Sequence, residues 1–223
     1  MFDLFFVFQT LAHISTFMIM DNALAQFVNN PYYLVHAIHN GFIVYLTAPD
    51  VIATITDFQN ITTYSANSKA ISLCFALHIY HILQYFKKLR FDDWLHHILM
   101  IGFALPVTLV VDAYTLIGFS LFFTTGLPGG IDYTLLFMVR NGWLDRMTEK
   151  RVNAWMNTWI RAPGCTAQAI CNVVSVFASD LPRDSVGFYL RLMPAVLVYW
   201  NGQYFMRQVV EDTVVQERLL LEE

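Results

Sequence analysis

The stretch SLCFALHIYHILQYFKKLRFDDWLHHILMIGFALPVTLV (residues 72–110) decides which fold this chain is expected to adopt. Two apolar blocks flank the short charged segment KKLRFDD, and each block approaches the length that a helix needs to cross a bilayer. The apolar residues are contiguous instead of forming one stripe at a helical period, which is typical of helices surrounded by lipid. The stretch therefore predicts two membrane-spanning helices joined by a short basic connection.

The composition of the whole chain favours the same class of protein. Of its 223 residues, 57% are hydrophobic and only 13% are charged, whereas about a quarter are charged in a typical soluble domain. The net charge of −4 argues against a nucleic acid partner. The three cysteines lie within or beside apolar blocks and lack the spacing of a disulfide framework or a zinc site.

Seven apolar segments predict an all-α, polytopic helical bundle that forms a single transmembrane domain over residues 1–223. The expected spans are residues 4–28, 32–56, 69–86, 94–112, 114–139, 155–179 and 186–206, followed by an acidic cytoplasmic tail at residues 207–223. Most Lys and Arg residues lie in the loops after spans three and five and in the tail, so the positive-inside rule places these parts in the cytoplasm. The N-terminus and the glycosylation triplet at Asn60 are then expected on the opposite side.

Six of the seven histidines are expected to gather in the cytoplasmic half of spans two, three and four. They are His36, His39, His78, His81, His96 and His97. The first two pairs have a spacing of three residues, so each pair shares a helix face. Polar side chains within spans usually face the bundle interior or a wet cavity. The sequence thus predicts a histidine-lined cavity open to the cytoplasm, and hydrogen bonding of each imidazole to carbonyls and water is the alternative.

The adjacent histidines suit acid–base chemistry. Neighbouring residues on a helix point about 100° apart, so we expect either His96 or His97 to act as general base or nucleophile while the other orients it or packs between helices. Asp92 and Asp93 lie one turn earlier and either hold an imidazole in one tautomer or complement the helix dipole. A metal site made by three imidazoles is a further alternative.

Two features of the second half of the chain complete the expected site. The segment GLPGGIDY (126–133) breaks span five and contains Asp132; it either kinks the helix to shape a lipid cavity or allows a close helix crossing. Arg161 lies just inside span six. Its guanidinium either extends to the headgroups or receives an anionic lipid phosphate.

Three blocks of the sequence resemble the TLC domain family, which contains the ceramide synthases and the translocating-chain-associated membrane proteins. The blocks are YYLVHAIHNGFIVYL (32–46), SLCFALHIYHIL (72–83) and FDDWLHHILM (91–100), of which only the last is specific. The resemblance covers roughly residues 30–205 and implies a six-helix core with His96, His97 and Asp93 as catalytic residues. Residues 116–136 lack the histidine of the second ceramide synthase motif, so ceramide synthesis is not implied.

The residues and the resemblance together predict a lipid-handling membrane protein with a lipid or acyl chain in the histidine-lined cavity. The expected substrate-binding residues are His36, His39, His78, His81, Asp132 and Arg161. If the protein is an enzyme, we expect acyl transfer from acyl-CoA as substrate, without a cofactor or a bound metal. The alternatives are a non-catalytic accessory subunit of a larger membrane complex and a histidine-metal membrane oxidoreductase.

The expected partners are membrane lipids, joined by fixed membrane proteins if the chain is a complex subunit. The expected location is an endomembrane such as the endoplasmic reticulum, or an organelle inner membrane for a complex subunit.

Overall fold

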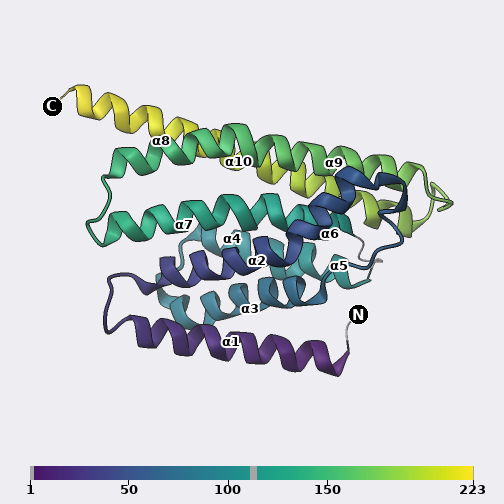
Figure 1. Cartoon of the computed structure of the whole chain (residues 1–223), viewed down its shortest axis with the longest axis horizontal. Helices are drawn as coiled ribbons and strands as arrows, with labels where there is room; N and C mark the ends of the chain where they lie inside the picture. The colour runs from purple at the N-terminus through teal and green to yellow at the C-terminus, as the bar shows by residue number, and fades with distance from the viewer. Residues whose placement is uncertain (1–2, 111–114, 223) are drawn as a thin grey trace.

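The computed structural model describes residues 3–110 and 115–222, which form seven long helical segments lying side by side in alternating directions (Figure 1). The all-α prediction is confirmed for these residues. Short turns of 3-10 helix, η1 (Phe58–Asn60) and η2 (Phe86–Lys88), lie in two of the connections. The seven segments are α1 (Leu4–Leu24), α2 (Pro31–Thr56), α3 (Ser68–Tyr85), α4–α5 (residues 91–110), α6–α7 (115–140), α8–α9 (146–177) and α10 (Val186–Leu221). The predicted limits between spans four and five fall partly on residues 111–114, outside the described residues.

Local chemistry fixes where the helices begin. The Asp3 carboxylate accepts a hydrogen bond from the backbone N–H of Phe6 at 2.8 Å and caps α1. Pro31 occupies the first turn of α2, where its missing N–H costs nothing. Asp145 caps α8 (Arg146–Met156) by accepting hydrogen bonds from the backbone N–H and the hydroxyl of Thr148, and these bonds hold the pKa of Asp145 below its usual value.

Three of the seven segments each contain a π-helical stretch. These stretches are η3 (Met100–Ala104) between α4 (Phe91–Leu99) and α5 (Leu105–Val110), η4 (Phe122–Gly126) between α6 (Thr115–Leu121) and α7 (Leu127–Arg140), and η5 (Asn157–Arg161) between α8 and α9 (Ala162–Phe177). A proline follows two residues after each: Pro106, Pro128 and Pro163. Proline lacks an N–H and its ring collides with the carbonyl four residues earlier in an α-helix, so a wider turn before it relieves the clash. The helix therefore continues through the expected break at GLPGG as the start of α7, and the π-helical stretch lies just before it.

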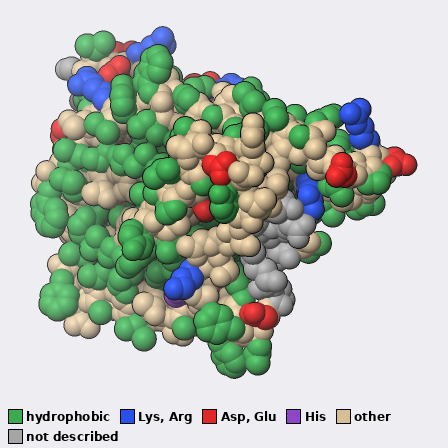
Figure 2. All heavy atoms as spheres, turned by 45° about the vertical axis from the view of Figure 1, so that its right-hand side comes forward, with side chains coloured by type: hydrophobic (Ala, Val, Ile, Leu, Met, Phe, Trp, Pro, Cys, Tyr) green, Lys and Arg blue, Asp and Glu red, His purple; other side chains and the backbone are tan. Residues whose placement is uncertain are grey.

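The interior of the bundle combines an apolar core with many buried polar side chains, and large apolar side chains also cover much of the outside. In α1, Thr10 and Asp21 are buried while Phe5 and Phe8 are exposed. In α9, Gln168 is only 1% exposed while apolar side chains on the other face are about half exposed. Uncharged side chains cover most of the visible surface, and charged ones are few (Figure 2). The many large apolar side chains on the outside are unusual for a protein surrounded by water.

Two helices, α1 and α2, are long and apolar enough to cross a membrane, and residues 93–107 form a shorter apolar helix. The remaining long segments are divided by π-helical stretches, are shorter, or carry charges.

The connections gather at two ends of the bundle. The loops after α1, α3 and α7 lie at the same end as the C-terminus, and the N-terminus lies at the other end (Figure 1). At the first end, the last turns of α10 pack along α8 and are joined to it by ion pairs from Lys150 to Asp212 and from Arg151 to Glu217. The segment expected as an acidic tail is thus largely a continuation of α10, described as far as residue 222.

Candidate functional site

Two adjoining cavities lie inside the bundle. The larger has a volume of about 290 Å³ and runs between α2, α3, the three π-containing segments and α10. The smaller has a volume of about 100 Å³ and lies among α2, α3, α4 and α7. Their common wall is made by five residues: Leu77, His78, His96, Thr125 and Tyr133.

Every residue predicted for the site lines one of these cavities. The smaller cavity is lined by His36, His81, Asp93 and His97. The larger cavity is lined by His39, Asp132 and Arg161. Both cavities are lined by His78 and His96. The structure thus brings the residues together, while their chemical roles stay predictions. Each of the three π-helical stretches also contributes side chains to the larger cavity, which fits the frequent occurrence of such turns at functional sites.

His97 is the central residue of a chain of three imidazoles. Its Nδ1 lies 3.1 Å from Nδ1 of His78, and its Nε2 lies 2.9 Å from Nδ1 of His81. A neutral imidazole has one donor nitrogen and one acceptor nitrogen, so His97 donates to one neighbour and accepts from the other. With both nitrogens engaged and only 3% of the residue exposed, His97 is held in place by α3 and has no nitrogen available for a substrate.

His96 has the opposite surroundings. Its ring centroid lies 5.1 Å from that of His78 and 5.5 Å from that of His97, and the residue lines both cavities. In the described part of the chain neither of its ring nitrogens has a hydrogen-bond partner. Of the two adjacent histidines, His96 is therefore the one whose nitrogens can reach a molecule in the cavities.

The histidines of α2 each form a hydrogen bond through Nδ1, and the backbone carbonyl beside His36 fixes its tautomer. His36 Nδ1 donates to the backbone carbonyl of Tyr32 at 2.8 Å, and His39 Nδ1 donates to the side-chain oxygen of Asn40 at 2.9 Å. The Nε2 of His39 is buried without a partner among the described residues. His39 also lines the larger cavity.

Asp93 has a structural partner at the start of α4. Its carboxylate accepts a hydrogen bond from the backbone N–H of Arg90 at 2.9 Å, as in a capping box. The same residue lines the smaller cavity, so capping does not remove it from the site. The side chain of Asp92 lies outside the described part of the structure.

Arg161 is buried in the bundle and does not extend to its surface; the residue is 8% exposed. Its Nη1 donates to the side-chain oxygen of Asn157 at 3.0 Å, and the guanidinium lies 5.0 Å from the ring centre of Phe205. The Nε atom has no partner in the described residues. A buried cation with unused donors beside a cavity is suited to an anionic group.

A chain of side-chain amides connects Arg161 with Asp132. Asn157 donates to the side-chain oxygen of Asn153 at 2.6 Å, and Asn153 donates to the carboxylate of Asp132 at 2.8 Å. Sequence reasoning did not identify these asparagines. Their signal is the four-residue spacing of Glu149, Asn153, Asn157 and Arg161, which places polar residues on one face of a helix.

Two tyrosines also belong to the site and were not predicted. Tyr32 and Tyr133 place their hydroxyls 3.4 Å apart, and both line the smaller cavity. The ring of Tyr133 lies 4.6 Å from that of His36, and the ring of Tyr32 lies 4.6 Å from that of His81. No motif marks them in the sequence, because it is the packing of α2, α3 and α7 that brings them together.

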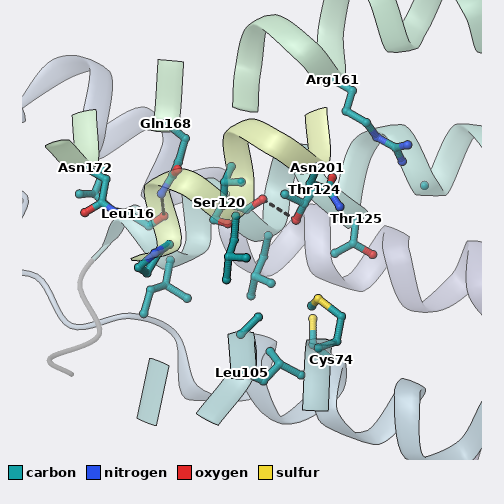
Figure 3. A pocket seen from close by; sticks show the side chains of 18 of the residues that line it. Cys74, Leu105, Leu116, Ser120, Thr124, Thr125, Arg161, Gln168, Asn172 and Asn201 are labelled. Atoms are coloured by element: carbon teal, nitrogen blue, oxygen red, sulfur yellow. Dashed lines mark hydrogen bonds between the residues drawn. The ribbon is translucent and has the colours of Figure 1, made fainter. Parts of the chain in front are cut away.

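Figure 3 shows the middle of the larger cavity. Gln168 and Asn172 of α9 lie on one side with Ser120 and Thr124, while Cys74 and Leu105 lie opposite. Gln168 donates to the backbone carbonyl of Leu116 at 3.2 Å, and its other amide atom, the oxygen, has no partner in the described residues. Polar groups therefore extend beyond the histidine end of the cavity.

No group of three or more His, Cys, Asp or Glu side chains in residues 3–110 and 115–222 is arranged to hold a metal ion. Comparison of the chain with models of protein families, with curated proteins and with solved structures gave no match.

Proposed function

We propose that the protein is a seven-span integral membrane protein that binds a lipid acyl chain in its larger cavity. The outward-facing apolar side chains and inward-facing polar ones support membrane insertion. The alternating helices place most Lys and Arg residues of the loops at one end of the bundle, which we assign to the cytoplasm. The histidine cluster lies in the half of the bundle nearer that end.

The shape of the larger cavity carries the proposal. Its lining residues on α9 and the preceding π-helical stretch extend from Arg161 to Val176, with Ser179 just after the helix, and those on α10 extend from Arg191 to Val209. Eighteen residues of helix correspond to about 27 Å at 1.5 Å per residue, close to the roughly 30 Å thickness of the hydrocarbon core. A long, narrow and mainly apolar cavity accommodates an acyl chain, with the polar head of the lipid near Arg161 and His96.

The free nitrogens of His96 suit acyl transfer from an acyl-CoA as the reaction of this site. His96 is the residue we assign as general base, and His97 positions α4 through its bonds to His78 and His81. Arg161 and the Tyr133 hydroxyl are placed to bind the polar part of the substrate.

Lipid analysis of the purified protein tests the binding function. The wild-type protein should retain about one acyl lipid per chain through detergent exchange, as measured by mass spectrometry. Ser175→Trp fills the cavity and should abolish retention. Val174→Trp, at the neighbouring outward-facing position that is 47% exposed, is the matched control and should retain the lipid. Equal retention by both variants, or no lipid in the wild type, would contradict the proposal.

The same preparation separates the proposal from its alternatives. Stoichiometric iron or zinc would favour a histidine-metal oxidoreductase, and a fixed set of copurifying membrane proteins with an empty cavity would favour an accessory subunit.

A further inference from the structure

Three side-chain amides in the middle of the larger cavity have unused hydrogen-bonding atoms. They belong to Gln168 and Asn172 on α9 and to Asn201 on α10, and all three residues line the cavity. Gln168 is 1% exposed and Asn172 is 8% exposed. A cavity for an unsubstituted acyl chain needs none of these groups, because an alkyl chain neither donates nor accepts hydrogen bonds.

The unpaired amide atoms indicate which kind of polar group a ligand must supply. The Nε2 of Gln168 donates to the carbonyl of Leu116, which fixes the orientation of the amide and leaves Oε1 as a buried acceptor without a partner. Oδ1 of Asn201 is buried without a partner as well, and the amide of Asn172, a residue that is 8% exposed, lines the same cavity. Buried polar groups in folded proteins are nearly always paired, so these atoms indicate a polar group supplied by a ligand or by water.

The position of the amides locates that polar group along a bound chain. Gln168 lies seven residues beyond Arg161 and Asn172 eleven residues beyond it, which corresponds to about 10 Å and 16 Å along the helix. A head group held by Arg161 therefore leaves the middle of its acyl chain beside Gln168. The head group itself cannot satisfy the amides at this separation.

The chemistry of the amides selects the type of group. The free oxygens of Gln168 and Asn201 require a donor, which excludes a keto group or an ether. The amide nitrogen of Asn172 is a donor and can bond an oxygen. A hydroxyl both donates and accepts, and it adds no charge to a part of the cavity where Arg161 is a full turn or more away.

From these contacts we propose that the bound lipid is an anionic acyl chain with a hydroxyl group near its middle, bound by Gln168 and Asn172. The inference rests on the proposed lipid-binding function and specifies its substrate class. The carboxylate or phosphate of the lipid lies toward Arg161, and the hydroxyl donates its one proton to Oε1 of Gln168 while accepting from the amide of Asn172. Oδ1 of Asn201 is then left to a water molecule.

The test compares three fatty acids on the delipidated full-length protein in detergent, by isothermal titration calorimetry. The probes are stearate, 10-hydroxystearate and 2-hydroxystearate. We expect 10-hydroxystearate to bind at least about tenfold more tightly than stearate, since a site with polar groups for a hydroxyl discriminates against a ligand that lacks one. The hydroxyl of 2-hydroxystearate lies beside the carboxylate, so this probe should bind like stearate.

Gln168→Leu should remove most of the preference for 10-hydroxystearate while stearate binding remains, which also shows that the variant is folded. Asn172→Leu is the second variant and should reduce the same preference if Gln168→Leu fails to fold. Equal binding of stearate and 10-hydroxystearate to the wild type would overturn the hydroxyl inference and leave the lipid-binding function standing. Absence of binding by all three fatty acids would overturn the lipid-binding function and the inference with it.

Discussion

His96 and His97 differ in their surroundings although they are neighbours in the chain. His97 connects α4 to α3 through two imidazole partners, whereas His96 faces both cavities without a hydrogen bond in the described residues. The difference follows from the roughly 100° between successive residues on a helix. One histidine therefore belongs to the structure of the bundle, and the other is available to a ligand.

We expect His97→Ala to lower the stability of the protein more than His96→Ala. Removing the ring of His97 leaves His78 and His81 each with a partly buried nitrogen that has lost its partner, at a cost of about 1–3 kcal/mol. His96→Ala should leave the midpoint of thermal unfolding in detergent nearly unchanged. If the protein transfers acyl groups, His96→Ala should abolish turnover. Equal destabilisation by the two substitutions would contradict this assignment.

The clustering of the histidines could be predicted from sequence because a titratable side chain within an apolar span usually faces the bundle interior or a wet cavity. All nine predicted residues accordingly line a cavity. Asn153 and Asn157 were not found, since an asparagine in isolation carries little information and their role depends on Asp132, which belongs to another helix. The unpaired oxygen of Gln168 could not be predicted either, because the carbonyl of Leu116 that orients the amide lies on another helix.

At the level of the helices, the described limits of the first five segments lie within about four residues of the predicted ones. The last two were predicted too short, because α8 begins at Arg146 in the segment expected as a loop and α10 continues to Leu221 through the expected tail. Their charged residues suit helix that extends beyond an apolar span, which a hydropathy pattern does not detect. The π-helical stretches were not predicted. Their signal is the proline that follows two residues after each one, at positions 106, 128 and 163. A proline in an apolar block is compatible with a break, a kink or a wider turn, and only the packing of the neighbouring helices decides among them.

The crossing of α2 and α7 depends on a glycine. A Cβ atom at Gly129 would lie 2.6 Å from Nδ2 of Asn40, whereas one at Gly130 would lie 3.6 Å from Cβ of Asn40, an ordinary contact. Asn40 cannot move freely because its oxygen accepts hydrogen bonds from His39 and Thr125. The close helix crossing, one of the two interpretations of GLPGG, therefore applies to this segment. Gly129 also lines the larger cavity, while the kink that would shape a lipid cavity stays a prediction.

Gly129→Ala should therefore destabilise the protein by about 1–3 kcal/mol, through overpacking and the loss of Asn40 hydrogen bonds. Gly130→Ala is the matched control and should be neutral or slightly stabilising, since alanine favours helix more than glycine does. Thermal unfolding of the two variants in the same detergent measures the difference. A smaller effect at Gly129 than at Gly130 would show that α2 and α7 are not packed as described.

For the whole molecule, the alternating helices and the distribution of Lys and Arg predict one orientation in the membrane. Asn60 should lie on the lumenal side, and the loop after α7 should lie in the cytoplasm. In vitro translation with microsomes should attach a glycan to wild-type protein and not to Asn60→Gln. Trp143→Thr, in the Asn60→Gln background, converts the triplet at Asn141 into an acceptor sequence that should remain unmodified. A glycan at Asn141 in place of Asn60 would invert the topology.

The length of α10 restricts how a soluble reactant can approach the site. Its 36 residues correspond to about 54 Å of helix, whereas the hydrocarbon core is about 30 Å thick. The remaining length lies with α8 beyond the proposed bilayer, at the end of the bundle nearer the histidines, and ion pairs hold the two helices together. This pair covers one flank of that end of the bundle. We therefore expect an acyl carrier to approach from the opposite flank, beside α3 and α4, where the basic residues of the KKLR loop meet its phosphates.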